Sequence, residues 1–308
     1  IGQLGQTHPE LPGKLLGLLD DPDHEIRAQV AKVMGQAKFK DALRPLIARL
    51  EDRSSRVRFF AAISLGQLGD VSARTALVKM LRENADRDPY LRHAGVMGLS
   101  GNSDLAGLQK YAGDPSFAVR LAMVLVHRRH ETAEIARFLN DADPLVVLEA
   151  ARAIHDVPIV DAMPNLAAIL GRAGLKDPQL LTRAVNANYR VGTEDCIERL
   201  KDCITSNAMP QATRVDAVKT FVDWAKPSGR DRVINLWRPL EPRDAAPVLA
   251  QIRPELASLL GSAPDQVCKE LLRLIDTYRV GSDLGDDLVK FVEDRQRSGA
   301  LRSSALEM

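Results

Sequence analysis

The sequence predicts an all-α fold, an α-solenoid (superhelix) built from stacked helix pairs. An apolar residue followed by Arg recurs at Ile26, Val57, Leu91 and Val119, at separations of 31, 34 and 28 residues. Between these steps the apolar residues follow helical spacing, and no run alternates apolar and polar residues as a strand would. One helix pair cannot bury its apolar face alone, so neighbouring pairs must stack.

Six stretches carry the repeat, and each starts with Asp near Pro or Ser: 21–36, 52–67, 86–101, 114–129, 143–156 and 177–190. Asp in that place predicts a helix N-cap, and Pro a first helical turn. Within 52–67, Val57, Ala61 and Leu65 share one face. Glycines at the helix ends predict C-caps: Gly5, Gly35, Gly69 and Gly192. Segments such as 41–50 and 71–81 supply the partner helices.

The repeat also suggests how the chain is organised. The opening letters IGQLG resemble LGQLG at 65–69, so residues 1–5 should be the tail of a second helix whose first helix is missing. We therefore expect the chain to begin inside a repeat of a longer protein. The predicted order is helical repeats over 1–225, an irregular basic insert over 226–244, further helical repeats over 245–297 and a frayed tail over 298–308.

Composition narrows the class of protein. The chain has 42 Lys and Arg against 41 Asp and Glu, a net charge of +1, which argues against a protein that binds nucleic acid with its whole surface. No apolar run is long enough to cross a bilayer. The three cysteines are sparse and odd in number, and Cys196 and Cys203 lie about 10 Å apart on one helix at 1.5 Å rise per residue. They predict buried thiols rather than a disulfide framework or a metal site.

The D-P-x-x-V-R-x-x-A-A-x-x-L-G phrase resembles the HEAT-like repeats of the phycobilin-lyase type, over roughly residues 1–225. That resemblance implies the fold and no single function. The stretches 84–99, 149–159, 183–192 and 224–244 also resemble the HEAT region of PVC-type haem-binding, sorbosone-dehydrogenase-like bacterial proteins. This narrower resemblance implies the middle of a large exported protein, periplasmic or in the cell envelope, between a dehydrogenase-like propeller and a c-type cytochrome module. The chain has no C-x-x-C-H, so haem c is expected only in a neighbouring domain and no cofactor in this chain.

Polar residues replace apolar ones at equivalent positions of the central repeats. Two adjacent columns result: His127, His155 and Tyr189, and beside them Arg128, Asp156 and Arg190. Stacked repeats place such positions about 9–10 Å apart. One interpretation is a groove with a charge ladder that binds a ligand or partner. The other is a row of hydrogen bonds between repeats and of solvated helix ends.

The insert carries a local charge of +3, from five basic and two acidic residues: Lys226, Arg230, Arg232, Arg238 and Arg243 against Asp231 and Glu241. Trp224 and Trp237 flank it. Basic side chains beside an aromatic ring can hold nucleic acid or an acidic partner, which makes Trp237, Arg232 and Arg238 binding candidates. Alternatively, Trp237 packs the insert onto the helices while the arginines project outward.

Two further patterns have structural interpretations. His127, His130 and Glu131 lie close in sequence, but a metal site needs a further ligand and a supporting shell, so no metal site is predicted. The repeated arginines form either a phosphate-binding stripe or ion pairs with aspartates of adjacent turns, such as Asp52, Asp88 or Asp114. Recurrence with the repeat favours the ion pairs.

No catalytic motif is present: no G-x-S-x-G, P-loop, G-x-G-x-x-G or H-E-x-x-H occurs. The sequence thus predicts a non-catalytic scaffold that binds a protein partner or flanking domains of the same polypeptide. Two alternatives stay open. One is a nucleic-acid-binding HEAT-like protein related to the alkylpurine DNA glycosylases, and the other a phycobilin-lyase-like chaperone for a linear tetrapyrrole.

Overall fold

The structure is a computed structural model that describes residues 10–308. The predictions for residues 1–5, including the cap at Gly5, lie outside that range. Over residues 10–308 the chain forms helices and no strand, and one isolated antiparallel bridge joins Arg230 and Trp237. The chain divides into two compact units, one ending at Ala153 and one spanning Ile154–Met308.

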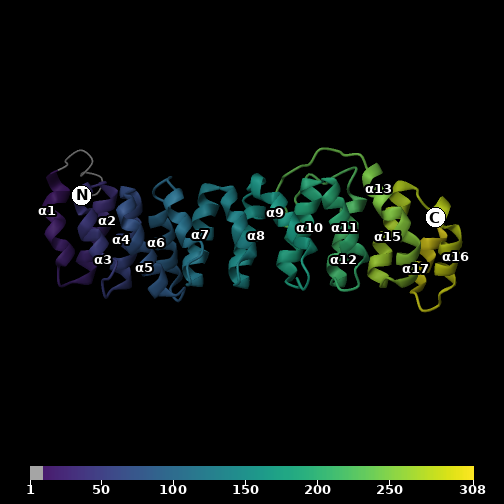
Figure 1. Cartoon of the computed structure of the whole chain (residues 1–308), viewed down its shortest axis with the longest axis horizontal. Coiled ribbons are helices and arrows are strands. Elements are labelled where there is room, and N and C mark those ends of the chain that lie inside the picture. Colours follow the sequence, from purple (N-terminus) through teal and green to yellow (C-terminus); the bar gives the residue numbers. More distant parts are fainter. Residues whose placement is uncertain (1–9) are drawn as a thin grey trace. The chain divides into compact units, whose positions relative to one another are not determined.

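The first unit stacks its helices side by side (Figure 1). Its α-helices are α1 (Glu10–Leu15), α2 (His24–Gln36), α3 (Leu43–Arg49), α4 (Ser55–Leu68), α5 (Arg74–Asn84), α6 (Pro89–Leu99), α7 (Phe117–His130) and the first part of α8 (Pro144–Asp156). Short 3-10 helices cover Leu16–Asp20, Lys40–Ala42, Val71–Ala73, Ala106–Tyr111 and Ala133–Asn140. Helix α2 packs against α4 and α4 against α6, while α3 and α5 pack on α4 and α6.

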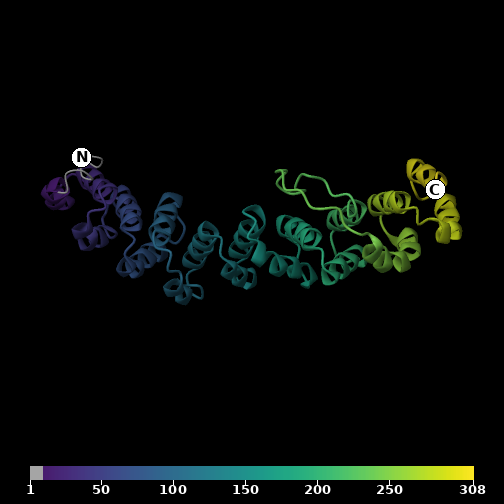
Figure 2. The same ribbon diagram turned by 90° about the horizontal axis from the view of Figure 1, so that it is seen from above.

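The second unit contains the insert. Its helices are the end of α8, then α9 (Met163–Ala168), α10 (Pro178–Val191), α11 (Glu194–Thr205), α12 (Gln211–Val222), α13 (Ala246–Ile252), α14 (Leu256–Ser262), α15 (Asp265–Tyr278), α16 (Gly285–Glu293) and α17 (Gly299–Leu306). Short 3-10 helices cover Val160–Ala162, Ile169–Gly171, Arg253–Glu255 and Ser282–Leu284. Helix α10 packs against α9, α11 and α12, and α12 packs against α15. Figure 2 shows the insert in green as a long non-helical segment beside these helices.

These packed pairs of sequence-adjacent helices confirm the predicted all-α, HEAT-like α-solenoid fold class. The repeat phrase forms the core as its spacing predicts, because Val57, Ala61 and Leu65 of α4 are all buried. Helix starts follow the expected chemistry. Asp88 and Asp177 are N-caps whose carboxylates accept backbone N–H bonds, and a proline follows each of them.

The glycines of the repeat have two different roles. Gly69 and Gly192 are C-caps in the left-handed region, with φ of 68° and 70°. The cap predicted at Gly35 is wrong, because Gly35 lies within α2. A Cβ at Gly35 would lie 2.3 Å from the Ser64 Oγ on α4. Gly35 is therefore required for the close approach of two helices.

In the third and fourth repeats the predicted partner helix does not form a regular α-helix. There the second element is the 3-10 helix Ala106–Tyr111 or Ala133–Asn140, not an α-helix. The first of these lies in a segment with Gly101, Gly107 and Gly113, and glycine disfavours an extended α-helix by about 1 kcal/mol per residue.

The tail predicted to fray over 298–308 instead forms α17 (Gly299–Leu306). Ser298 caps the helix by accepting from the Leu301 N–H, and Leu301 and Ala305, four residues apart, are buried. This short amphipathic pattern is stabilised by packing against α15 and α16.

Candidate functional site

Residues 229–238 of the insert form a small hairpin, here called the insert hairpin. The Arg238 N–H donates to the Gly229 carbonyl at 2.9 Å, and the Asp231 N–H donates to the Leu236 carbonyl at 2.8 Å. Asn235 has a φ of 56°, in the left-handed region that asparagine tolerates, and it closes the turn. The hairpin therefore has a defined conformation, although it contains no regular strand.

Asp231 fixes the hairpin from inside. Its Oδ1 accepts the Val233 and Ile234 N–H bonds at 2.9 and 3.1 Å, and its side chain is fully buried. Burial opposes ionisation, but these N–H bonds and the nearby His155 and Arg238 lower the pKa of Asp231. The carboxylate is thus a charged, buried centre of the turn.

The other oxygen of Asp231 attaches the hairpin to α10. Its Oδ2 lies 3.1 Å from Asn186 Nδ2, 3.3 Å from Arg190 Nη1 and 3.4 Å from Arg238 Nη1. Both Nη atoms of Arg190 also donate to the Arg238 carbonyl at 3.2 Å. Two guanidinium groups and one amide therefore surround a single carboxylate. Two of the three, Asn186 and Arg190, join the hairpin to a helix over 40 residues away in sequence.

His155, at the end of α8, continues the same network. Its Nε2 lies 2.7 Å from Asn186 Nδ2, and its Nδ1 lies 2.8 Å from an Asp156 oxygen. Asp156 also binds Arg183 Nη2 at 2.8 Å. Burial alone would raise the pKa of Asp156, but the bonds from His155 and Arg183 outweigh it and lower that pKa to about 2.

A second anchor holds the end of the insert. The Arg243 guanidinium lies 3.9 Å from the centroid of the Trp224 ring and 4.8 Å from that of Tyr189, and it donates to the Tyr189 carbonyl at 2.7 Å. The Tyr189 hydroxyl donates to the Asp223 carbonyl at 3.1 Å, and burial raises the pKa of Tyr189. Asp223 in turn binds Arg232. Stacked cation–π contacts therefore attach this part of the insert to α10 and to the segment that follows α12.

These contacts are the opposite of the alternative in which Trp237 packs the insert onto the helices while the arginines project outward. Three of its arginines, Arg232, Arg238 and Arg243, turn inward, while Trp237 is 72 % exposed and Leu236 is 58 % exposed. The Trp237 ring lies across Gly229, where a Cβ would be 2.4 Å from the ring. The arginines anchor the insert, and the apolar side chains face solvent.

Much of the insert's positive charge is compensated by carboxylates. Arg232 pairs with Asp223 and Asp216, and Arg190 and Arg238 share Asp231. Lys226 and Arg230 are the two basic residues of the insert with exposed side chains. The site thus presents an apolar pair beside two cations.

The structure separates the two predicted polar columns. His155 and Tyr189 are buried and cannot line an open groove, and Asp156 and Arg190 pair with other partners, so these four residues belong to the base of the insert. In the first unit, His127 is also buried. Its Nδ1 lies 2.6 Å from Thr132 Oγ1, and burial lowers its pKa.

Arg128 follows His127 on α7 and is half-buried. His130 Nε2 is 3.1 Å from the Ser100 carbonyl, and Glu131 is the left-handed C-cap of α7, with a φ of 52°. Within residues 10–308, no three His, Cys, Asp or Glu side chains gather as metal ligands would.

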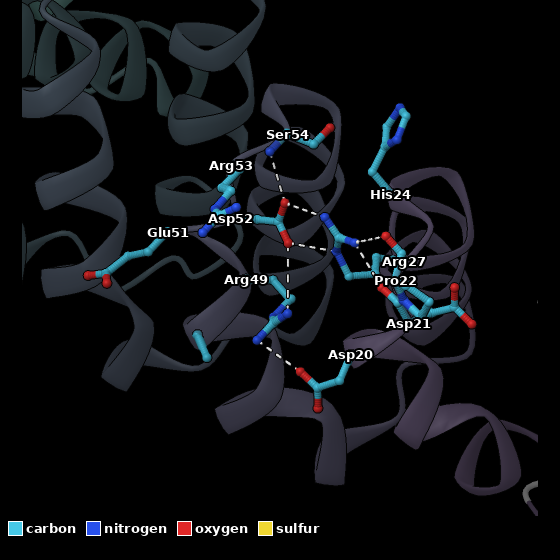
Figure 3. A pocket seen from close by; sticks show the side chains of 11 residues that line it. Asp20, Asp21, Pro22, His24, Arg27, Arg49, Glu51, Asp52, Arg53 and Ser54 are labelled. Carbon is cyan, nitrogen blue, oxygen red and sulfur yellow. Dashed lines mark hydrogen bonds and ion pairs between the residues drawn. The ribbon is translucent and has the colours of Figure 1, made fainter.

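Three of the four arginines in the series of the first unit, Arg27, Arg92 and Arg120, form ion pairs, and the partner of Arg27 is one of the expected aspartates. Arg27 donates from Nε and Nη2 to both oxygens of Asp52 at 2.8 and 2.9 Å (Figure 3). Arg120 binds Asp141 in the same way, at 2.7 and 2.9 Å. Asp114 forms an ion pair with Arg82, and Arg92 pairs with Asp86 rather than with Asp88. Arg58 makes no ion pair with any residue described.

Sequence reasoning missed several residues of the site. Asn186, Asp231, Arg183 and Arg243 carry many of its contacts beside the predicted residues, and Leu236 is one of its two exposed apolar side chains. One signal was available: Asn186 and Asn188 are amides within a mostly apolar stretch of a helix, and amides buried there need partners. Nothing in the sequence indicated that Asn186 would contact Asp231.

Among the described residues no helix has the length and apolar character to cross a membrane. All three cysteines are buried and unpaired.

Residues 12–100 match the family model of HEAT repeats. A search of curated proteins finds no match. The solved structures similar to this chain include three proteins of different kinds. The CpcE–CpcF complex of phycocyanin lyase from a Nostoc species is 21 % identical, with 69 % of this chain and 87 % of that one covered and a TM-score of 0.33. An engineered protein is 17 % identical, with 96 % and 86 % covered and a TM-score of 0.42. Human deoxyhypusine hydroxylase in complex with glycerol is 16 % identical, with 90 % and 98 % covered and a TM-score of 0.33.

Proposed function

We propose that this HEAT-like repeat chain is a non-catalytic scaffold that binds a partner protein through the insert hairpin. The observation that supports this is the exposure of Leu236 and Trp237 on a loop whose base is buried and bonded. A loop that served only to connect α12 with α13 would not need a buried carboxylate and two arginines to hold it.

The hairpin has the properties of a binding anchor. Tryptophan is enriched at the centres of protein interfaces, where a few residues supply most of the affinity. Because Asp231 and Arg190 already order the backbone, little conformational entropy is lost when a partner covers Trp237. The exposed Lys226 and Arg230 lie in the same segment. The expected partner surface is an apolar pocket with acidic side chains at its rim.

The proposed parent protein is a large exported bacterial dehydrogenase–cytochrome polypeptide in which this chain is the helical middle segment. The resemblance of 84–99, 149–159, 183–192 and 224–244 to PVC-type proteins supports it. The coding sequence on either side of the chain tests this proposal. A dehydrogenase-like propeller upstream and C-x-x-C-H downstream are expected. Their absence would refute the proposed parent protein but not the proposed contact through the insert hairpin.

The hairpin contact is tested by comparing Trp237→Ala with Val160→Ala, because Val160 is equally exposed at 72 % in the same unit. Proteins that co-purify with the wild type from the native cells are identified, and the affinity of each purified partner is measured by calorimetry. A true partner should lose at least tenfold in affinity with Trp237→Ala, about 1.4 kcal/mol, and less than twofold with Val160→Ala. Equal affinity for wild type and Trp237→Ala would refute the proposed contact.

A further inference from the structure

Arg58 on α4 differs from the other members of its repeat series. Its Nη1 donates to the Asp52 and Arg53 carbonyls at 2.7 and 3.4 Å, which is the contact that Arg27 and Arg120 make with their own turns. In Arg27 and Arg120, Nε and Nη2 hold both oxygens of an aspartate. In Arg58 these two donors make no hydrogen bond to any residue from 10 to 308.

The reason lies in the turn that precedes α6. Asp86 stands two residues before the N-cap Asp88, as Asp52 stands two residues before the N-cap Ser54. Ala85 and Asp86 both adopt left-handed backbone, with φ of 47° and 61°. The Asp86 carboxylate consequently binds Arg92 of its own repeat at 2.7 and 2.9 Å. The carboxylate that the repeat pattern would give to Arg58 is directed elsewhere.

Arg58 instead lines a pocket of about 540 Å³ between α4, α5 and the turn before α6. Arg87 lines it too, and its guanidinium donates to the carbonyls of Asn84 and Glu83, not to an acid. The other charges around the pocket are already engaged. Glu51 and Glu83 both bind Lys79, and the Asp88 carboxylate caps α6. Arg58 and Arg87 are therefore the two pocket cations with no acidic side chain.

We propose that this pocket binds a carboxylate of an acidic peptide segment from a partner protein, held by Nε and Nη2 of Arg58. Arg27 and Arg120 show the geometry, because the same donors in the same helical position hold an aspartate through two parallel bonds. Arg87 adds a second positive charge. The acids around the pocket are held by Lys79 and by the first turn of α6, so Arg58 and Arg87 are the cations left for an incoming carboxylate.

Nuclear magnetic resonance of the arginine side chains tests the chemistry directly on the full chain. Acetate is titrated into the ¹⁵N-labelled protein at low salt, and the Nε–Hε signals are followed. The Arg58 signal, assigned by its loss in Arg58→Lys, should shift in a saturable way. The Arg27 signal should stay fixed, because its donors are held by Asp52. No shift at Arg58, or equal shifts at both residues, would overturn the proposal.

Peptide binding tests the source of the carboxylate. A fluorescein-labelled Asp-Asp-Gly-Asp peptide is bound to the wild type and to variants, with fluorescence anisotropy as the readout and inorganic phosphate as competitor. Arg58→Lys keeps the charge but loses the fork and should weaken binding at least fivefold. Arg53→Gln removes a neighbouring exposed charge and should change it less than twofold. Equal losses in both variants, or phosphate binding tighter than the peptide, would contradict a carboxylate site.

The two proposals fail independently, because the Arg58 pocket lies in the first unit and the insert hairpin in the second. Thermal melting of Arg58→Lys checks that the variant folds. A variant that melts within a few degrees of the wild type and still binds the peptide as tightly would exclude Arg58 as the anchor.

Discussion

Replacing Asp231 with Asn should release the insert hairpin while the helices stay folded. Asn keeps the size of the side chain and one oxygen acceptor, so the change removes mainly the negative charge. Arg190 and Arg238, whose side chains are only 15 % and 14 % exposed, would then share no carboxylate. Removing one partner of a buried ion pair typically costs 3–5 kcal/mol, because the remaining charge is left uncompensated.

The magnitude can be worked from the contacts. A hydrogen bond to a charged acceptor contributes about 1.5–3 kcal/mol, and a neutral one about half of that. Two backbone N–H bonds and two guanidinium groups are affected, and the hairpin relaxes toward solvent once released. A net loss of about 3 kcal/mol in docking free energy corresponds to roughly a hundredfold rise in the open population.

Native-state hydrogen exchange measures that population at single amides. The Asp231, Val233 and Arg238 N–H groups are bonded within the hairpin and should exchange about a hundredfold faster in Asp231→Asn, whereas amides inside α10 should keep their protection. Glu241→Gln is the matched control, because Glu241 is an exposed acid of the same insert. Protection of the hairpin amides within tenfold of the wild type would refute the idea that Asp231 holds the loop.

Three other outcomes follow from individual contacts. Gly35→Ala should lower the free energy of unfolding by about 1–3 kcal/mol in urea titrations, because its methyl group meets Ser64, whereas Gly17→Ala, with open space around it, should change it little. Ala85→Gly should raise the melting temperature slightly by relieving left-handed strain of about 1 kcal/mol, and a clear fall would contradict that explanation. The lowered pKa of Asp156 means that its ion pair stabilises the fold above the ordinary value of 3.8 and is lost as pH falls toward about 2. In urea unfolding, the wild type should be more stable than Asp156→Asn at pH 5, and this difference should shrink by about 2 kcal/mol at pH 2. An equal difference at both pH values would contradict the role of the Asp156 ion pair.

The sequence predicted the parts of the fold that depend on local pattern. The spacing of Val57, Ala61 and Leu65 places them on one buried face, and Asp88 followed by Pro89 starts a helix. These features follow from contacts within one repeat or with the next, which recur at nearly constant separation. Gly35 was misjudged because a glycine near a helix end looks the same whether it caps the helix or admits a neighbour.

The candidate site was predicted only in part, since its contacts span distances that no local pattern records. Tyr189, Arg190 and Arg238 were identified as candidates, but their roles depend on partners far along the chain. Arg238 donates to the carbonyl of His155, 83 residues earlier. The inward turn of the arginines also could not be inferred from composition, because the charge of a segment does not specify which side of it faces solvent.

The chemistry of the hairpin base supports a role in positioning Trp237 rather than in stability alone. An apolar plug of similar volume would stabilise the docked loop about as well, because a buried ion pair loses much of its Coulomb energy to desolvation. Apolar contacts, however, permit the loop to slide and rotate. The bonds from Asp231 to Val233, Ile234 and Asn186 are directional, so they fix one orientation of the hairpin. That orientation keeps the Trp237 ring close to Gly229 and largely exposed to solvent, which makes it accessible to a partner pocket.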